Sequence, residues 1–171
     1  RSRGLGDVYK RQVVYMPAYG AEKRGGTVWC NVTISDGRIG ALFIARPTIA
    51  VAMNSASLAR FEKTTRTGGL LMVNQTLIPE KVQRNDIDVV YVPANDLAAE
   101  VGNSDVGNLV VLGVMLTRRA VVSLDSIDRI MADTLARNKA RLAENRQAIE
   151  KGVAWARTEY AGRTSGPKGG G

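Results

Sequence analysis

The segment 17–26 holds the residues best suited to chemistry in this chain. Gly25 and Gly26 have no Cβ, so a ligand or a partner can approach their backbone closely. Their N–H groups and the guanidinium of Arg24 could together hold a phosphate or a carboxylate. Glu22 could orient Arg24 or pair with a cation on a partner. A tight connection that carries a surface ion pair explains the same residues without any ligand.

A second candidate lies at Asn54 and Ser55, which follow a short apolar run at 48–53. Ligands of open α/β sheets gather outside the carboxyl ends of the strands, and this position fits that rule. Asn and Ser are also the preferred caps of helix amino termini. Capping of the helix that follows is the simpler interpretation.

A third set combines carboxylates with an amide: Asp96, Glu100, Asn103 and Asp105. Oxygen ligands of this kind could bind a cation, but their spacing matches no standard calcium loop. We interpret the set as a solvated loop.

Composition removes several classes of catalysis. The 171 residues include no histidine, so histidine-dependent triads and histidine-ligated zinc are excluded. The single cysteine, Cys30, can form neither an internal disulfide nor a cluster site of four thiolates.

Net charge is +8, but residues 1–12 carry +3 of it and residues 152–171 carry +2. The excess therefore lies mostly at the two ends of the chain, and no basic stripe with interleaved aromatic residues crosses the middle. We expect no nucleic-acid partner. No apolar run approaches the ~20 residues of a membrane span, and the start lacks the pattern of a signal peptide. We expect no membrane partner and a cytoplasmic location.

The sequence predicts two short strands early in the chain, joined by a loop at 17–26. A strand at 13–16 should end at Pro17, and a second strand at 27–35 places Val28, Cys30, Val32 and Ile34 on one face. That apolar face should be buried, with Cys30 as a small buried hydrophobe.

Further along, apolar runs alternate with helical patterns. The runs at 48–53, 70–73 and 88–92 are typical of buried parallel strands. Helices are expected at 56–63, 96–101, 108–118, after a cap at Ser123, and at 139–155. The fold class is therefore α/β, with an open, mostly parallel sheet sandwiched by helices. We expect one α/β domain at 13–155, a non-native or disordered leader at 1–12 and a flexible tail at 156–171.

The segment Tyr19–Thr27 (Tyr-Gly-Ala-Glu-Lys-Arg-Gly-Gly-Thr) resembles the Tyr-Gly-x-Glu-x-Arg-Gly-Gly signature of the gamma subunit or domain of 2-oxoacid:ferredoxin oxidoreductases. The resemblance continues over about 13–152, through Cys30-Asn31-Val32, Ala52-Met53-Asn54, Gly68-Gly69-Leu70-Leu71 and Asn108-Leu109-Val110. Members of the family begin with a strand, a Gly-x-Gly-Gly-Gln-Gly turn and a helix. Nothing in 1–12 matches this start, so the resemblance predicts an amino-terminally truncated sheet that lacks its first strand and helix.

The resemblance implies a non-redox component of an enzyme that oxidatively decarboxylates a 2-oxoacid to acyl-CoA. Thiamine diphosphate and iron–sulfur clusters would be held by partners, namely alpha and beta subunits and an iron–sulfur subunit or domain. Coenzyme A would be the co-substrate and ferredoxin the acceptor. No catalytic residue or metal ligand is assigned to this chain. A docking surface, or a wall of the coenzyme A or active site, is expected at Tyr19, Gly20, Glu22, Arg24, Gly25, Gly26 and Asn54.

Two other classes stay open at the level of sequence. One is a free-standing α/β module that binds a nucleotide or another phosphate-containing ligand. The other is a basic nucleic-acid-binding protein, whose binding should then survive removal of 1–12 and 152–171. Among 2-oxoacids, the sequence does not distinguish pyruvate, 2-oxoglutarate, branched-chain oxoacids and indolepyruvate.

Overall fold

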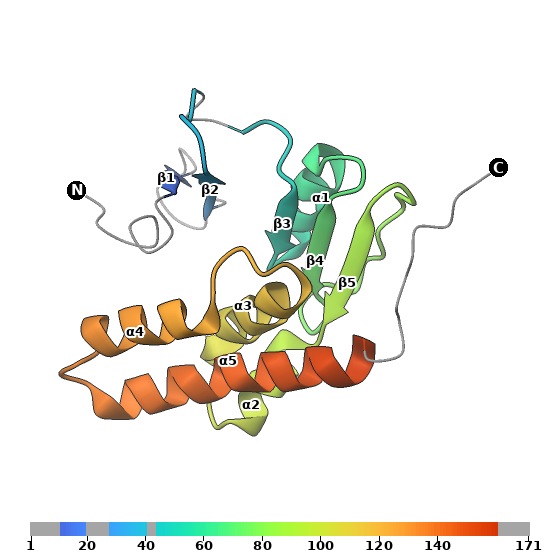
Figure 1. Cartoon of the computed structure of the whole chain (residues 1–171). Coiled ribbons are helices and arrows are strands. Elements are labelled where there is room, and N and C mark those ends of the chain that lie inside the picture. Colours follow the sequence, from blue (N-terminus) through green and yellow to red (C-terminus); the bar gives the residue numbers. More distant parts are fainter. Residues whose placement is uncertain (1–10, 20–27, 41–43, 161–171) are drawn as a thin grey trace. The chain divides into compact units, whose positions relative to one another are not determined.

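A computed structural model of the chain describes residues 11–19, 28–40 and 44–160 (Figure 1). The chain divides into two compact units, one within residues 1–91 and the other within residues 92–171. The first unit contains the strands up to β5, and the second contains the later helices.

A three-stranded sheet has the order β3-β4-β5 and consists of β3 (Ile49–Ala52), β4 (Leu70–Asn74) and β5 (Asp88–Val92). β3 and β4 are parallel, with Ile49 opposite Leu70, and helix α1 (Ser55–Thr64) connects them. Figure 1 draws the arrows of all three strands in the same direction. The predicted parallel α/β sheet is thereby confirmed, with β4 and β5 close to the expected bounds.

One side of this sheet packs against α1. Leu71 and Val73 of β4 form a buried cluster with Ala50 and Ala52 of β3, and Leu58 of α1 closes it. Phe61, one turn after Leu58, packs at the margin of the cluster. The predicted inward spacing of Leu58 and Phe61 on α1 is confirmed.

The turn before β4 requires glycine at two consecutive positions, Gly68 and Gly69. Gly68 has a φ of +72°, a left-handed conformation that favours glycine. A Cβ at Gly69 would lie 2.6 Å from the Arg66 carbonyl oxygen and 3.0 Å from that of Thr48. The backbone can therefore turn tightly into β4 only where side chains are absent.

β1 (Gln12–Tyr19) and β2 (Val28–Ser35) form a separate two-stranded antiparallel sheet, with Gln12 opposite Ser35. The prediction that Pro17 ends the first strand was wrong, because β1 continues through Pro17, which lies opposite Cys30. Proline is tolerated in an edge strand where the missing N–H faces away from the ladder. In this two-stranded sheet each strand has a single partner.

The predicted buried and exposed faces of β2 are inverted over Val28–Val32. Val28 is 67% exposed and Val32 is 56% exposed, and Cys30 between them is also exposed. The alternate residues Trp29 and Asn31 are half-buried instead. The expectation that Cys30 is buried was therefore wrong. The physical reason is that alternation identifies which residues share a face, but cannot identify what covers that face.

The second unit is helical. It contains α2 (Ala94–Glu100), a short 3-10 helix (Ser104–Val106), α3 (Gly107–Arg118), α4 (Leu124–Thr134) and α5 (Lys139–Tyr160). α2 begins directly after Pro93, earlier than predicted, and α5 continues past Trp155. The side chain of Ser123 accepts a hydrogen bond from the Ser126 N–H, which confirms the predicted cap of α4.

The core of this unit lies where α3 and α5 pack together. Val110, Val114, Ala148, Ile149 and Val153 from these two helices are buried. Within the described ranges, no helix is both long enough and apolar enough to cross a membrane.

Candidate functional site

The hairpin defines where the glycine-rich segment starts and ends. Tyr19 is the last residue of β1, and its backbone pairs with Val28 at the start of β2. Of the other predicted site residues, Gly20, Glu22, Arg24, Gly25 and Gly26 lie outside the described residues. The segment 20–27 is thus the connection between two adjacent antiparallel strands.

Trp29 and Arg60 join the base of this connection to α1. The guanidinium carbon of Arg60 lies 4.0 Å from the centroid of the Trp29 ring. Trp29 is opposite Ala18, one position from the end of the strand pairing. A cation over an aromatic face contributes about 0.5–1 kcal/mol at an exposed site. This one side-chain contact links the middle of α1 to the hairpin near its loop end.

Sequence reasoning missed this pair. Trp29 and Arg60 are separated by a strand end, a loop, β3 and half of α1. No local period connects residues at such a distance, so only the tertiary structure brings them together.

Asn54 caps the amino terminus of α1. Its side-chain oxygen accepts a hydrogen bond from the Ser57 N–H at 2.8 Å, and its extended backbone (φ −152°) precedes the helix. Ser55, next to it, donates its hydroxyl to the Glu80 carboxylate at 2.9 Å. The capping interpretation of Asn54 is confirmed. Asn54 is also exposed, so a partner can still reach it.

The residues of the third candidate set, the carboxylates and the amide between positions 96 and 105, make separate contacts. Glu100 forms an ion pair with Lys151 of α5, and Asn103 accepts a hydrogen bond from the Asp105 N–H at 2.9 Å. Over the described ranges of the chain, no group of three potential metal-ligating side chains is found. A chain with one cysteine also cannot supply the thiolates of an iron–sulfur cluster. The residues of this chain therefore do not fit such a cluster.

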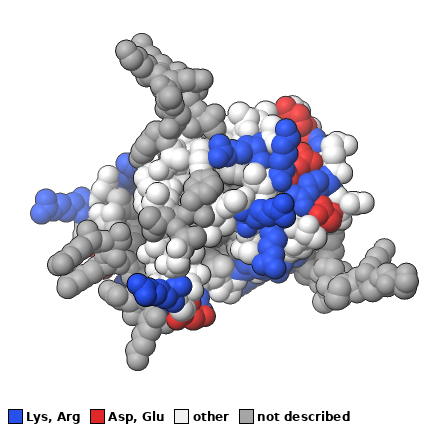
Figure 2. Space-filling model, turned by 90° about the horizontal axis from the view of Figure 1, so that it is seen from above, with Lys and Arg blue, Asp and Glu red and all other residues white. Residues whose placement is uncertain are grey.

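Two arginine–aspartate pairs shift the pKa values of their own side chains. Hydrogen bonds from Arg84 and then from Thr67 hold the pKa of Asp86 well below its usual range, and the same contact raises the pKa of Arg84. A hydrogen bond from Arg146 likewise lowers the pKa of Asp128. On the face drawn in Figure 2, blue Lys and Arg side chains gather with red Asp and Glu among them. That face is mixed in sign and is not a uniform basic stripe.

Arg84 also fixes the end of α1. Its Nη1 donates to the carbonyl oxygens of Glu62 at 2.8 Å and of Thr65 at 2.6 Å, while Nε and Nη2 hold the Asp86 carboxylate. The last turn of a helix leaves carbonyl groups without partners, and a guanidinium can satisfy them. This contact stabilises the helix whose other end carries Asn54.

Comparison with known proteins gives the family. The family model for pyruvate ferredoxin/flavodoxin oxidoreductase matches residues 6–155, which is most of the chain. This match confirms the resemblance found in the sequence.

The curated relatives are subunits of oxoacid-oxidising enzymes. Ketoisovalerate oxidoreductase subunit VorA of Methanothermobacter marburgensis is 32% identical over 89% of this chain and 32% of its own length. The chain thus spans about a third of the length of this relative. 2-Oxoglutarate synthase subunit KorC of Methanocaldococcus jannaschii is 26% identical over 83% of this chain and 76% of its own length.

Two solved structures have the same fold. The gamma subunit of a keto/oxoacid ferredoxin oxidoreductase from Geobacter sulfurreducens is 26% identical, with a TM-score of 0.71 over 90% of this chain and 85% of its own. A 2-oxoglutarate:ferredoxin oxidoreductase from Magnetococcus marinus gives a TM-score of 0.78 at 19% identity, over 92% of this chain and 27% of its own. The matched residues, the fold and the relatives agree: the chain belongs to the pyruvate ferredoxin/flavodoxin oxidoreductase family.

Proposed function

We propose that this chain acts as the gamma component of a 2-oxoacid:ferredoxin oxidoreductase. In this role it is a non-redox part of a complex that oxidatively decarboxylates a 2-oxoacid to acyl-CoA. The observation that carries the proposal is the likeness to the Geobacter gamma subunit, which this chain matches over most of both lengths. Relatives that are subunits of oxidoreductases favour this function over a free-standing phosphate-binding module.

The proposal assigns the redox chemistry to partners. Thiamine diphosphate would be bound by alpha and beta subunits, and the clusters by an iron–sulfur subunit or domain. Coenzyme A would be the co-substrate of the complex and ferredoxin its electron acceptor. Lack of histidine and a single cysteine agree with this division of labour. We place the complex in the cytoplasm, and a chain with a single cysteine agrees with that location.

Co-purification tests the proposal. The chain, tagged in its native cell, should bring down thiamine-binding and cluster-bearing subunits. The purified material should reduce a ferredoxin or a viologen dye only when a 2-oxoacid and coenzyme A are present. A chain that purifies alone, with no such activity in the pool, would overturn the proposal.

Within this complex, we propose that the hairpin connection and the start of α1 form a docking surface or a wall of the coenzyme A or active site. The residues concerned are Tyr19, Gly20, Glu22, Arg24, Gly25, Gly26 and Asn54. The contact of Arg60 with Trp29 supports this grouping, because it links α1 to the strand that follows the connection.

Arg24 gives the sharpest test of that surface. Arg24→Ala should lower turnover or subunit association in the assembled enzyme, because the guanidinium next to Gly25 and Gly26 in the sequence is lost. Lys23→Ala is the matched control, since it removes a neighbouring positive charge from the same segment. Equal activity and assembly in both variants would argue against a specific role for Arg24.

A further inference from the structure

A basic patch lies where α1 ends and where β3 and β4 begin. It consists of Arg46, Lys63 and Arg66, which are all exposed and all belong to the first unit. Lys63 lies in the last turn of α1. The Arg66 N–H donates to the Pro47 carbonyl oxygen at 3.0 Å, which brings the segment before β3 next to the segment after α1. Figure 1 draws the strands with their starts upward, and Figure 2, seen from above, shows Lys and Arg side chains gathered on that side.

The carboxylates near the basic patch are engaged within the chain. Asp86 accepts hydrogen bonds from the guanidinium of Arg84 and from the Thr67 hydroxyl, each at 2.7 Å. Glu62 accepts from the backbone N–H groups of Gln83 and Arg84, at 2.6 and 3.3 Å. Within the described part of the chain, by contrast, the side chains of the basic patch form no ion pair. The charge that a partner can use here is therefore positive.

The charges of the surrounding segments are not balanced. Residues 46–67 carry four Lys or Arg and one Glu, because Arg60 adds to the basic patch one turn before Lys63. Residues 80–86, which contact α1, carry two charges of each sign. The net charge of these two segments is +3, which favours an acidic partner.

The basic patch also has no apolar centre. Among the described residues, the exposed large hydrophobic side chains lie in the hairpin, after β4 and on α4. Permanent subunit interfaces bury an apolar core, whereas small transient interfaces depend more on charge, which accelerates the encounter of the two proteins. The basic patch therefore suits a partner that binds and leaves quickly.

We propose that the basic patch is a docking surface for an acidic, transiently bound protein, the electron acceptor of the complex. The inference rests on the proposed function, in which ferredoxin is this acceptor. An acceptor protein must bind and dissociate in every turnover. Complementary charge gives rapid association without the slow dissociation of a tight apolar interface. The proposal requires a cluster of Asp and Glu on the acceptor surface that meets the basic patch.

The kinetics of the assembled enzyme with two different acceptors test the docking surface. Arg46→Gln, Lys63→Gln and Arg66→Gln, combined in one variant, should raise the KM for ferredoxin about tenfold at low salt, and less at high salt. The kcat for reduction of a viologen dye, measured with 2-oxoacid and coenzyme A, should equal that of the parent enzyme. A small dye needs no protein docking surface, so this second rate reports that the complex is assembled and active.

A matched variant controls for the change in net charge. Arg129→Gln, Arg137→Gln and Lys139→Gln remove the same two Arg and one Lys from exposed positions in α4, after α4 and at the start of α5. The KM for ferredoxin should then change less than about twofold, because charges far from a docking site are screened by salt. An equal rise of KM in the two triple variants would overturn the proposal.

The remaining outcomes separate the docking surface from the proposed function. Unchanged ferredoxin kinetics in the patch variant overturn the docking proposal alone, whether or not the patch binds another polyanion such as a DNA oligonucleotide. Loss of viologen reduction or of subunits from the patch variant would assign the patch to assembly, and also overturns the docking proposal. A parent chain that forms no complex overturns the proposed function and the docking proposal together.

Discussion

Gly152 of α5 lies directly against the Val110 carbonyl oxygen of α3, so that a Cβ at position 152 would overlap that oxygen. The contact is reciprocal, because a Cβ at Gly113 of α3 would overlap the Ile149 carbonyl oxygen of α5. The two helix backbones therefore touch where each helix lacks a side chain. This close crossing joins the two helices that form the core of the second unit.

Gly152→Ala should destabilise the chain by about 3 kcal/mol, because the added methyl group must push α5 away from α3. Alanine is the better helix former by roughly 1 kcal/mol, so a net loss would report the clash and not the propensity. Thermal and denaturant unfolding measure the change. The control is Gly40→Ala, where nothing lies within 4 Å of the added Cβ. Equal stability of the two variants would contradict the close crossing.

Asp86 should make stability depend on acid pH. Its pKa is lowered in the folded state by hydrogen bonds from Arg84 and Thr67, so the unfolded chain binds its proton more readily. This contribution is fully present above the unfolded pKa of about 3.9 and is lost as pH falls through the lower folded value. Melting temperatures of the parent chain should therefore drop below about pH 4.

Asp86→Asn should flatten part of that acid dependence and lower stability near neutral pH. Asp133→Asn, at an exposed carboxylate of α4, serves as the control and should leave the profile unchanged. If both substitutions gave the same profile, the Arg84–Asp86 contact would not be coupled to folding.

Two substitutions at Asn54 separate its capping role from a role in binding. Asn54→Ala removes the acceptor for the Ser57 N–H and should cost about 1 kcal/mol of stability. Asn54→Asp keeps an acceptor oxygen and should retain the stability of the parent chain. Turnover of the assembled enzyme, measured for both variants, then shows whether the side-chain amide of Asn54 is needed for activity. A loss of turnover in Asn54→Asp at full stability supports a binding role, and parent activity limits Asn54 to capping.

Local patterns predicted the elements of this fold well. The run Leu70–Val73, the cap at Ser123 and the inward spacing of Leu58 with Phe61 all have the structures expected. Each depends on residues within one or two turns of one another, where capping and periodicity act directly. The bounds failed at Pro17 and beyond Trp155, because neighbouring strands and helices decide how far an element extends.

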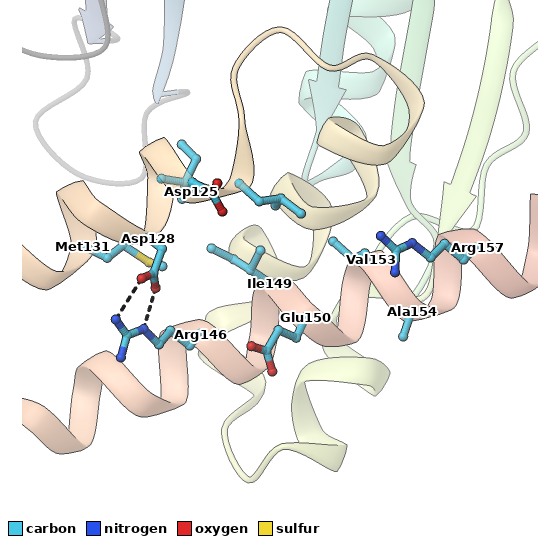
Figure 3. A pocket seen from close by; sticks show the side chains of 11 residues that line it. Asp125, Asp128, Met131, Arg146, Ile149, Glu150, Val153, Ala154 and Arg157 are labelled. Carbon is cyan, nitrogen blue, oxygen red and sulfur yellow. Dashed lines mark hydrogen bonds and ion pairs between the residues drawn. The ribbon is translucent and has the colours of Figure 1, made fainter. Parts of the chain in front are cut away.

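The candidate site was less accessible to sequence reasoning. A cap at Asn54 or Ser55 was predicted and Asn54 provides it, but the contact between Arg60 and Trp29 needs the tertiary fold. Met131 of α4 lines a groove whose second wall comes from Ile149 and Val153 of α5, and no local pattern predicts that arrangement either (Figure 3). A helical period predicts that α4 has an apolar face, yet it says nothing of how much of that face stays uncovered.

The reactivity of Cys30 tests whether the face of β2 that carries Val28, Cys30 and Val32 is exposed. In the structure it is exposed, between Val28 and Val32, so its thiol should react with a colourless disulfide reagent in the folded chain without denaturant. The alternation of the sequence instead predicts a thiol that reacts only after unfolding, because an apolar face is normally covered. Since Cys30 is the single cysteine, the absorbance reports this one position, and Cys30→Ser gives the blank. Slow reaction in the assembled enzyme, with fast reaction in the separate chain, would show that a partner covers this face of the hairpin. Slow reaction in both would contradict the exposed position of Cys30.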